Sequence, residues 1–464
     1  MANIDKAFKA YDVRGVYGED IDDDLAWKIG HGSAQFLRSQ LSGYDRGQAS
    51  SNRLVVGRDM RPSSPALVKS LVEGITSSGA GCFDIGLCDT PMVYFAVNHL
   101  QTCGGIQVTA SHNPVEYNGF KVSGLKAKPI GELTGLREIK HLVSALRRMP
   151  ESASLGAVQV VDLWTEYRRH VLKFLRLSRP MKVVVDASNG AGGKMIPSIF
   201  HDVANLEIVP LNFEIGQGFA HPPDPLVAAN LAQLQAAVKE HKADLGICLD
   251  GDADRCMFVD ENGEIVRCDL MTALLARHFL ADNPGAMVVY DLRSSHVVAE
   301  EIKAGGGVPR RERVGHSFMK KALADGRGVF GGELSGHFYF RDNFNCDSGA
   351  IAFATVLTVL SSHPEGVTLG QLIAPLKRYV SSGEINFKVD NKEAMFKKLQ
   401  DTYAKARNID RLDGVTIEFD DWWFNVRASN TEPLMRLNLE ARDRKLMDEK
   451  LRELKNMLGE PVKH

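Results

Sequence analysis

The chain lacks the features that mark several large classes of protein. Its seven cysteines are scattered through 464 residues and never form a CxxC pair, which argues against a disulfide framework or a zinc site. This usage predicts a reducing cytoplasm. The first residues, MANIDKAFKAYDVRG, contain no apolar signal segment, and the longest apolar stretch, around 350–360, is too short to span a bilayer. We therefore expect no export, no transmembrane helix and no membrane partner.

An excess of charge of either sign is also missing. Lys and Arg total 56 and Asp and Glu total 58, which gives a formal net charge of −2. Proteins that bind nucleic acids normally carry a stripe of basic residues. We therefore expect no nucleic-acid partner and take a small molecule as the default ligand. Hydrophobic residues make up 44% of the chain and charged residues 25%, as in ordered globular proteins. At about 150 residues per domain, the length predicts three domains, or four if some are small.

Three pairs of apolar strands indicate three repeated α/β units. The first strand of each pair ends in a charged residue and enters a turn, as in LVVGRDMRPSS, VVVDASNGAGG and VVYDLRSS. The second strand ends in a polar, glycine-rich loop, as in GIQVTASHNP, LGICLDGDADR and GVFGGELSGH. Ligands gather at the carboxyl ends of strands in open α/β sheets, so the three loops could converge on one cleft between units.

Breaks in this pattern divide the chain into four predicted domains. We expect α/β domains over residues 1–157, 158–260 and 261–376, and a smaller α+β domain over 377–464. The breaks are a linker at RRMPESASLGA, a hairpin at DENGE and a turn-rich segment at SSHPEGVTLGQL. In the last domain GEINFKV, GVTIEF and WWFNVR read as strands, and a final helix carries an apolar stripe of Met447, Leu451, Leu454 and Leu458.

The motif DGDADR is the strongest local signal. Its carboxylates, at Asp250, Asp252 and Asp254, follow an apolar strand directly and are hard oxygen ligands of the kind that bind Mg²⁺. Three like charges so close together are costly without a cation. An EF-hand would find Glu261 at its twelfth position, but Arg255 replaces the glycine of its sixth, and strands flank the motif. A phosphotransferase with Asp250 as nucleophile and a solvated acidic turn are further alternatives.

A second loop, TASHNP, places Ser111 at a tight turn with His112 and Asn113 beside it. The same residues would suit an ordinary turn that ends a strand. The downstream segment YNGFK brings the ammonium of Lys121 near the loop, where it could bind a phosphoryl group or move a proton. The loop could therefore take part in phosphoryl chemistry or serve only as a turn at the end of a strand.

A third loop, GGELSGH, offers Glu333 and Ser335 as an acceptor and a donor for sugar hydroxyls, with His337 next to them. A plain glycine-rich turn is the alternative. The segment VGHSFMK supplies another loop histidine, His316, although a single histidine is more often part of a core.

The segment RASNTEP lies between two predicted strands and has the composition of a phosphate-binding nest. It combines the guanidinium of Arg427 with the hydroxyls of Ser429 and Thr431 and with loop amides. A simple hairpin turn is the alternative. Near the N-terminus, KAYDVRG offers Tyr11 and Arg14, which could equally belong to a surface turn.

Taken in order, AYDVRG, TASHNP, DGDADR, GGELSGH and RASNTEP resemble the motifs of the α-D-phosphohexomutase superfamily over essentially the whole chain, most closely its bacterial phosphomannomutase/phosphoglucomutase branch. The resemblance implies three similar mixed α/β/α sandwich domains and a smaller C-terminal α+β domain around a central active-site cleft. It also implies an enzyme that interconverts the 1-phosphate and 6-phosphate of mannose, glucose or both. A phosphoserine, Mg²⁺ and a hexose 1,6-bisphosphate, as intermediate or activator, would take part.

The resemblance also implies roles for individual residues. Its metal ligands would be Ser111, with its phosphate, Asp250, Asp252 and Asp254. Lys121 is the first candidate general base and His337 the second. The residues around the transferred phosphoryl group would be Arg14, His112, Lys121 and Arg255. The residues that bind substrate would be Tyr11, Arg293, His316, Glu333, Ser335, His337, Arg427, Ser429, Asn430, Thr431 and Arg436.

Two positions depart from the pattern of the branch. Leu334 stands where Met is expected, or Gln in phosphoglucosamine mutases, and Arg293 stands where Lys is common. Leu334 argues against a phosphoglucosamine mutase but leaves mannose and glucose open. That mutase, a catalytically silent sugar-phosphate-binding regulator and a metal-dependent phosphatase are the remaining alternatives. We expect a phosphosugar ligand and a monomer or weak dimer.

Overall fold

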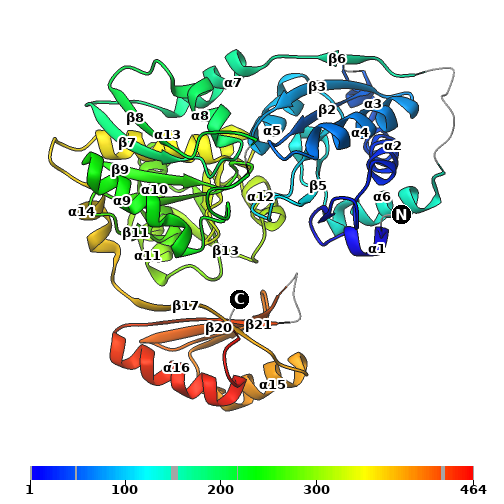
Figure 1. The fold of residues 1–464 in the computed structure, drawn as a ribbon. Coiled ribbons are helices and arrows are strands. Elements are labelled where there is room, and N and C mark those ends of the chain that lie inside the picture. Colours follow the sequence, from blue (N-terminus) through cyan, green and yellow to red (C-terminus); the bar gives the residue numbers. More distant parts are fainter. Residues whose placement is uncertain (1–2, 48–49, 148–154, 217, 430–433, 463–464) are drawn as a thin grey trace. The chain divides into compact units, whose positions relative to one another are not determined.

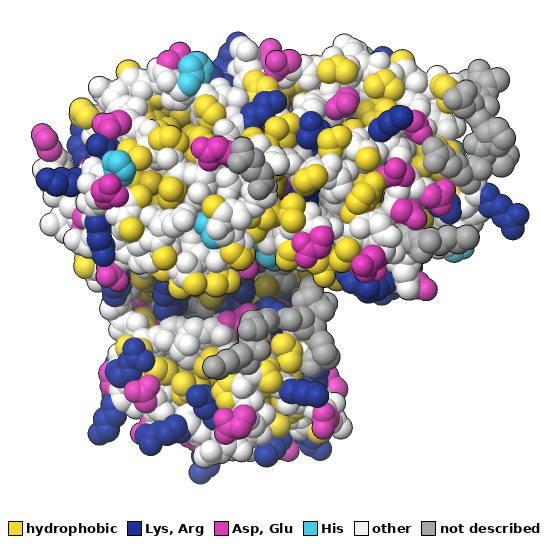
Figure 2. Space-filling model, viewed as in Figure 1, with side chains coloured by type: hydrophobic (Ala, Val, Ile, Leu, Met, Phe, Trp, Pro, Cys, Tyr) yellow, Lys and Arg dark blue, Asp and Glu magenta, His cyan; other side chains and the backbone are white. Residues whose placement is uncertain are grey.

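The computed structural model describes residues 3–47, 50–147, 155–216, 218–429 and 434–462 (Figure 1). The chain divides into two compact units. The first consists of Met1–Arg267 and Ser335–Gly370, and the second of Cys268–Leu334 and Gln371–His464. Within the described residues, every helix is too short or too polar to cross a membrane. Basic and acidic side chains are interspersed over the face in Figure 2, in keeping with the net charge of −2.

The first unit begins with a six-stranded mixed sheet in the order β1-β5-β4-β2-β3-β6. Its strands are β1 (Val13–Val16), β2 (Arg53–Arg58), β3 (Gly81–Leu87), β4 (Gly104–Val108), β5 (Tyr117–Ser123) and β6 (Val158–Val160). Its helices are α1 (Ile4–Ala7), α2 (Asp23–Ser39), α3 (Gly43–Arg46), α4 (Ser64–Ser77), α5 (Thr90–His99) and α6 (Leu136–Ala145). Strand β2 runs parallel to β3 and β4, whereas β5 runs antiparallel to β4 and β1.

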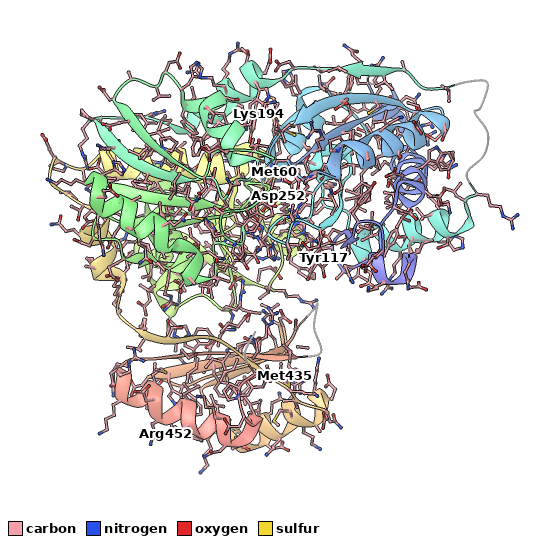
Figure 3. The ribbon with its side chains drawn as sticks, viewed as in Figure 1. Met60, Tyr117, Lys194, Asp252, Met435 and Arg452 are labelled. Atoms are coloured by element: carbon pink, nitrogen blue, oxygen red, sulfur yellow. The ribbon has the colours of Figure 1, made fainter. Side chains whose placement is uncertain are left out.

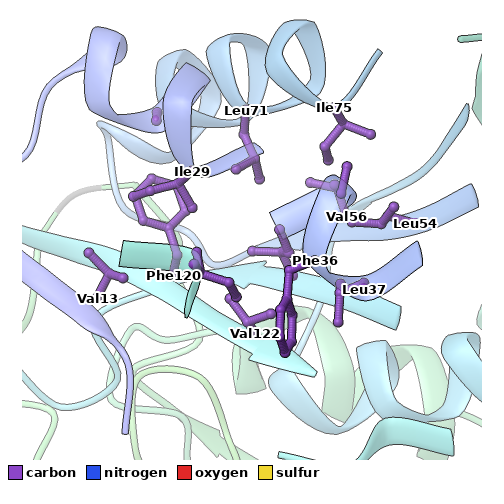
Figure 4. Close-up of a cluster of buried hydrophobic side chains, with 14 of the residues drawn as sticks. Val13, Ile29, Phe36, Leu37, Leu54, Val56, Leu71, Ile75, Phe120 and Val122 are labelled. Carbon is purple, nitrogen blue, oxygen red and sulfur yellow. The ribbon is translucent and has the colours of Figure 1, made fainter. Parts of the chain in front are cut away.

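Helices cover both faces of this sheet. Leu54 and Val56 of β2 point into a buried apolar cluster with α2 and α4 (Figure 4). The intervening Val55 points the other way, toward α5. Helices α2 and α4 pack closely, because a Cβ on Gly74 of α4 would lie 1.9 Å from the carbonyl oxygen of Trp27 in α2. The strand alternation thus produces a three-layered α/β/α arrangement.

A five-stranded sheet in the order β11-β10-β9-β7-β8 follows in the same unit. Its strands are β7 (Met181–Asp186), β8 (Leu206–Leu211), β9 (Leu245–Leu249), β10 (Cys256–Asp260) and β11 (Ile265–Val266). The same unit contains β15 (Phe338–Phe340) and β16 (Cys346–Asp347), which pair antiparallel. Its helices are α7 (Trp164–Val171), α8 (Gly192–Phe200), α9 (Ala232–His241) and α13 (Gly349–Ser361). The longest apolar run of the sequence lies in α13, where every residue is buried.

The second unit holds a parallel set of strands, β13-β12-β14, and an antiparallel sheet, β17-β21-β20-β19-β18. The strands are β12 (Met287–Asp291), β13 (Val308–Glu312), β14 (Phe330–Gly332), β17 (Val380–Phe387), β18 (Asn408–Asp410), β19 (Val415–Glu418), β20 (Trp422–Ala428) and β21 (Met435–Ala441). The helices are α10 (Cys268–Asp282), α11 (His296–Ala304), α12 (His316–Asp325), α15 (Lys392–Thr402) and α16 (Arg444–Leu458).

These elements confirm the predicted fold class, with three α/β sheets and a smaller antiparallel α+β part. The strands expected at LVVGRD, VVVD and VVYD are β2, β7 and β12, and those expected at GEINF, GVTIEF and WWFNVR are β17, β19 and β20. The predicted stripe of α16 is also confirmed. Met447, Leu454 and Leu458 are buried in the core of the last sheet, and Leu451 packs against it.

Candidate active site

Ser111 lies in the loop that follows β4, with its side chain buried. Its φ of +51° falls in the left-handed region that residues other than glycine rarely adopt. Its amide donates to Thr109 Oγ1 at 2.9 Å, and its hydroxyl donates to Asp250 Oδ2 at 2.8 Å. The unusual turn therefore directs a hydroxyl at a carboxylate 139 residues further along the chain.

The backbone of this loop is held by Arg61, a residue missing from the predicted site. Arg61 is 1% exposed. Its Nη2 donates to the carbonyl oxygens of Ser111 (2.9 Å) and Asn113 (2.7 Å), and its Nη1 donates to that of Pro114. Asp59 Oδ2 accepts from Arg61 Nε at 3.0 Å. Both charged residues belong to LVVGRDMRPSS. Their position directly after an apolar strand is the sequence pattern that could have indicated a role in the site.

The acidic loop DGDADR links β9 to β10 and buries all three of its carboxylates. Asp250 and Asp252 are fully buried and Asp254 is 3% exposed, and one oxygen of each lies within 4.8 Å of the others. Figure 3 shows Asp252 in its place beside Met60. A Cβ on Gly251 would lie 2.3 Å from the carbonyl oxygen of Ser111, so a glycine is needed for the two loops to approach this closely. Strands on both sides exclude the EF-hand, which requires helices there.

These carboxylates fit a hard divalent cation. Asp252 Oδ1 and Asp254 Oδ1 are buried and accept no hydrogen bond from any described residue. A buried acceptor without a partner costs free energy, and a coordinated cation would remove that cost. Carboxylate oxygens are the ligands that Mg²⁺ prefers. The loop is therefore a candidate Mg²⁺ site by its own chemistry.

Lys121 of β5 places a positive charge between two of these carboxylates. Its Nζ lies 2.7 Å from Asp252 Oδ2 and 2.6 Å from Asp254 Oδ2. Burial alone would lower the pKa of the ammonium, but the two carboxylates outweigh burial and raise that pKa. The residue predicted as the first general base is therefore protonated in this structure.

The carboxyl groups of Asp250 and Asp254 respond to this environment in opposite directions. Burial, together with the charges of Asp254 and Asp252, raises the pKa of Asp250 well above its usual range. Burial also acts to raise the pKa of Asp254, but Lys121 and His337 outweigh it and hold that pKa well below the usual range. The carboxylate that accepts the Ser111 hydroxyl is thus the more basic of the two.

His112 and Arg14 both contact residues of the Ser111 loop. His112 Nδ1 is 3.3 Å from Ser111 Oγ. Burial, followed by the positive charges of Arg255 and Arg14, lowers the pKa of His112 well below its usual range, so its imidazole is neutral. Arg14 Nη1 donates to Asn113 Oδ1 at 2.5 Å. The structure thus brings both residues to the predicted phosphoryl-transfer centre.

Arg255 and His337 complete this centre. Arg255 Nε lies 3.4 Å from His337 Nε2 and 3.8 Å from Asp250 Oδ2. His337 Nε2 is 3.6 Å from Asp254 Oδ1, and His337 Nδ1 is 2.9 Å from Ser335 Oγ. All of the predicted catalytic and metal-binding residues therefore meet in the first unit, and they form one connected network.

A second charged cluster lies in the second unit around Glu384, another residue missing from the predicted site. Glu384 Oε2 is 2.9 Å from Arg427 Nη2 and 3.7 Å from Arg293 Nη1, and Oε1 is 3.1 Å from Arg436 Nη1. Burial alone would raise the pKa of Glu384, but the three guanidiniums lower it to about 2. Nothing in the segment GEINF marked this glutamate, because its partners come from three other strands and turns.

Glu333, in the same unit, directly follows β14 and is held by a backbone hydrogen bond. It is 1% exposed, and its Oε1 accepts from the backbone amide of Gly315 at 2.9 Å. Asp291, at the end of β12, accepts from Arg293 Nη2 at 2.7 Å and from the amide of Leu334 at 2.8 Å. Asp291 thus orients Arg293, a predicted substrate-binding residue. In the sequence, only the position of Asp291 at the end of a strand could have indicated this role.

The structure also describes three other predicted substrate-binding residues. Tyr11 is half-buried ahead of β1, His316 is half-buried at the start of α12, and Ser429 is nearly buried just after β20. Asn430 and Thr431 lie outside the described residues.

Comparison with known proteins identifies the family of the chain. Four profiles match in order, for the alpha/beta/alpha domains I, II and III of phosphoglucomutase/phosphomannomutase and for its C-terminal domain. They cover residues 5–147, 165–263, 268–379 and 384–456. The chain belongs to the phosphoglucomutase/phosphomannomutase family. The resemblance drawn from the five motifs is confirmed, and the protein is an enzyme of the phosphohexomutase type.

Relatives of this phosphohexomutase match it over nearly its whole length. A phosphomannomutase of Vibrio cholerae is 38% identical, over 97% of this chain and 98% of its own. A protein of Xanthomonas campestris pv. campestris named phosphohexose mutases is also 38% identical, over 97% and 99%. Among solved structures, a phosphoglucomutase/phosphomannomutase family protein of Burkholderia thailandensis aligns with a TM-score of 0.88 and 31% identity, covering 100% of this chain and 99% of that one.

Proposed function

We propose that this protein interconverts the 1-phosphate and the 6-phosphate of mannose, glucose or both. The reaction would pass through a phosphoserine at Ser111 and a hexose 1,6-bisphosphate, with Mg²⁺ bound. The observation that carries the proposal is the 2.8 Å hydrogen bond from Ser111 Oγ to Asp250 Oδ2, in a buried centre with three carboxylates. Phosphoryl transfer depends on positioning and charge neutralisation more than on a strong nucleophile, so a hydroxyl beside a cation site suits it.

Asp250, Asp252 and Asp254 would hold the Mg²⁺, together with the phosphate on Ser111. When bound, the ion supplies charge neutralisation at the phosphoryl oxygens. The buried Oδ1 of Asp252, which accepts no hydrogen bond from any described residue, supports this assignment. Arg14 and Arg255 would add positive charge around the phosphoryl group, and the neutral His112 would offer a hydrogen bond beside Ser111 Oγ.

Lys121 is our first candidate for the general base, and His337 is the second. The carboxylates of Asp252 and Asp254 now raise the pKa of Lys121, whereas its burial lowers that pKa. Once the charge of the two carboxylates is neutralised, burial is the larger influence, and the ammonium can release its proton. Lys121 would then accept the proton of the attacking sugar hydroxyl.

The phosphate that does not react would bind to Arg293, Arg427 and Arg436, with help from Ser429, Asn430 and Thr431. The three guanidiniums already bind a carboxylate, that of Glu384, which supports an anion site here. A sugar phosphate would compete with this carboxylate. The residues that would contact the sugar are Tyr11, His316, Glu333, Ser335 and His337.

We further propose that the protein works in the cytoplasm, as a monomer or weak dimer, on phosphosugars rather than on nucleic acid or at a membrane. The buried positions of all seven cysteines, each a free thiol, are compatible with a reducing compartment.

Incubation with mannose 1-phosphate and with glucose 1-phosphate tests the proposal. The purified enzyme receives Mg²⁺ and a trace of hexose 1,6-bisphosphate, and phosphorus NMR resolves the products. We expect the matching 6-phosphate. Free phosphate as the main product would identify a phosphatase instead, and tight binding without turnover of either sugar would identify a silent regulator. Faster turnover of glucosamine 1-phosphate would overturn the sugar assignment.

Paired serine variants locate the reaction. Ser111→Ala should lose most turnover and still bind substrate, because the hydroxyl is the phosphoryl carrier. Ser33→Ala removes an equally buried hydroxyl in α2 and should leave turnover unchanged. Undiminished turnover in Ser111→Ala would mean that another group carries the phosphoryl.

A further inference from the structure

A second group of potential metal ligands lies in the first unit, outside the residues that the proposed reaction uses. Asp186 is the last residue of β7 and pairs with Cys248 of the parallel strand β9. His221 comes from the segment between β8 and α9. One ligand atom of each residue lies within 4.8 Å of the other two. An oxygen, a nitrogen and a sulfur donor therefore converge at one point from three elements.

His221 faces a hydrogen-bond acceptor at each of its ring nitrogens. Nδ1 lies 2.9 Å from the carbonyl oxygen of Pro222, and Nε2 lies 3.0 Å from Asp186 Oδ2. A neutral imidazole has one N–H group and can satisfy only one of these acceptors. With that proton on Nδ1, toward the carbonyl, a second proton or a cation must lie between Nε2 and the carboxylate. A carbonyl oxygen at the far ring nitrogen is also the contact that orients metal-binding histidines.

Hydrogen bonds from neighbouring residues fix Asp186, and Ser188 lies beside Cys248. Asp186 Oδ1 accepts from the amide of Ser188 at 2.9 Å and from Asn212 Nδ2 at 3.1 Å, which leaves Oδ2 directed at His221. Ser188 Oγ donates to the carbonyl oxygen of Leu249 at 2.6 Å and lies 3.4 Å from Cys248 Sγ, so it accepts from the thiol. Supporting contacts of this kind are typical of metal sites, where they hold ligands in position before the ion arrives.

The site is buried but can be reached from one side. Asp186 and Cys248 are fully buried, whereas the side chain of His221 is 11% exposed. An ion would therefore enter past the imidazole. The segment that carries His221 is also bound through its neighbour, since the amide of Ala220 donates to Asn189 Oδ1 at 2.7 Å. The cluster thus lies where this segment attaches to the strands of the sheet.

We propose that Asp186, His221 and Cys248 bind a divalent cation of borderline softness, with Zn²⁺ as the favoured ion. A thiolate and an imidazole select such a cation, whereas Mg²⁺ prefers oxygen ligands like those of the DGDADR loop. Binding replaces the thiol proton of Cys248 and any proton on His221 Nε2, and these protons pass to solvent. The ion fastens the segment of His221 to β7 and β9. No CxxC spacing marks this site, because its three ligands come from different elements.

Cobalt substitution tests this proposal, because a thiolate bound to Co²⁺ gives a charge-transfer band in the near ultraviolet and a carboxylate does not. The full-length protein is stripped with a chelator, saturated with Mg²⁺ to fill the DGDADR loop, and titrated with Co²⁺. We expect the band to saturate at one equivalent per chain and to disappear when Zn²⁺ is added. Zn²⁺ should also raise the melting temperature by a few degrees. Absence of the band at one equivalent would overturn the proposal.

Variants assign the band to these residues independently of mutase activity. Cys248→Ser should abolish it, whereas Cys82→Ser, which alters an equally buried thiol in β3, should leave it unchanged. If Cys248→Ser does not fold, His221→Gln serves instead, because the side chain of His221 is partly exposed. Loss of the imidazole should weaken Co²⁺ binding at least tenfold. A band that persists in Cys248→Ser, or unchanged affinity in His221→Gln, would contradict the assignment. Both readouts are independent of whether the proposed mutase reaction occurs.

Discussion

The two compact units contain charge clusters of opposite composition. In the first unit, two carboxylates of the DGDADR loop bind the ammonium of Lys121, and Arg255 lies 3.8 Å from the third, that of Asp250. In the second unit, three guanidiniums lie around the carboxylate of Glu384, and one of them also binds Asp291. The first cluster keeps an excess of negative charge and the second an excess of positive charge.

In each cluster, one residue of opposite charge, Lys121 or Glu384, shows which kind of ion the surrounding residues can bind. Lys121 provides a cation among carboxylates, and one of these, Asp252, keeps a buried oxygen that accepts no hydrogen bond from the part of the chain that the structure describes. Glu384 provides an anion among guanidiniums, which are well matched to phosphate oxygens. In the proposed reaction, the metal and the reacting phosphoryl group would therefore bind at the first cluster and the second phosphate at the other. Substitutions in one cluster should therefore have different effects from substitutions in the other.

The largest effect is expected when the acidic cluster loses a charge. Asp252→Asn should lower kcat about 10²–10³-fold, because it removes an electrostatic group from the phosphoryl-transfer centre. It should also raise the Mg²⁺ concentration needed for half-maximal rate. Rates measured across a Mg²⁺ series test both effects. Asp202→Asn, at an exposed carboxylate, is the control, and a Mg²⁺ response equal in the two variants would remove Asp252 from the metal site.

The next effect concerns the placement of the Ser111 hydroxyl. Arg61→Lys keeps the charge but loses most of the bonds to the loop carbonyls, so we expect kcat to fall up to about 100-fold through misplacement of Ser111. KM should change little, because Arg61 contacts the loop rather than the sugar. Steady-state kinetics separate the two constants. A rise in KM with normal kcat would show that Arg61 does not act by positioning Ser111.

A smaller effect is expected in the basic cluster. Arg427→Lys preserves the charge but not the planar fork, and the loss of one charge-assisted hydrogen bond should raise KM about tenfold with less change in kcat. Arg411→Lys, at an arginine with a half-exposed side chain, should leave both constants unchanged. If Arg427→Lys lowered kcat alone, the cluster would belong to the reacting centre instead of the second phosphate.

The smallest effect should come from Glu384. Glu384→Gln removes the anion that competes with phosphate, so inorganic phosphate should bind several-fold more tightly, as measured by calorimetry. Weaker binding would mean that Glu384 is needed to orient the arginines.

The ionisation of Glu384 should also make the free energy of unfolding depend on pH. Its pKa is lowered to about 2 in the folded protein, so its stabilising contribution is fully present above about pH 5 and is lost as the pH falls toward 2. Denaturant unfolding should show wild type and Glu384→Gln converging in this window. A difference that stays constant as the pH falls would contradict this charge pairing.

Much of the fold was predictable because its signals are local. Short β-branched runs that end in Asp or Arg identify β2, β7 and β12, and four apolar residues at helical spacing identify the buried face of α16. The acidic loop was also predictable, since three alternating carboxylates directly after a buried strand repel one another unless a cation lies between them.

The rest of the site depends on tertiary contacts that no local pattern contains. Arg61 acts on the backbone carbonyls of a distant loop, and any residue type could supply those carbonyls. Glu384 is recognised only by the arginines that the folded sheet brings to it. The protonation of Lys121 follows from a balance between burial and two carboxylates, and both must be known from the structure.

If Ser111 carries the phosphoryl group, as we propose, peptide mapping by mass spectrometry will find the group on its peptide. Enzyme stripped of phosphate is incubated with hexose 1,6-bisphosphate and Mg²⁺ and then digested. We predict one phosphoryl group, on the peptide that contains Ser111, in the wild type and in Ser33→Ala, and none in Ser111→Ala. Phosphate on any other residue of a protein that turns over, or turnover without a phosphorylated peptide, would show that Ser111 is not the phosphoryl carrier.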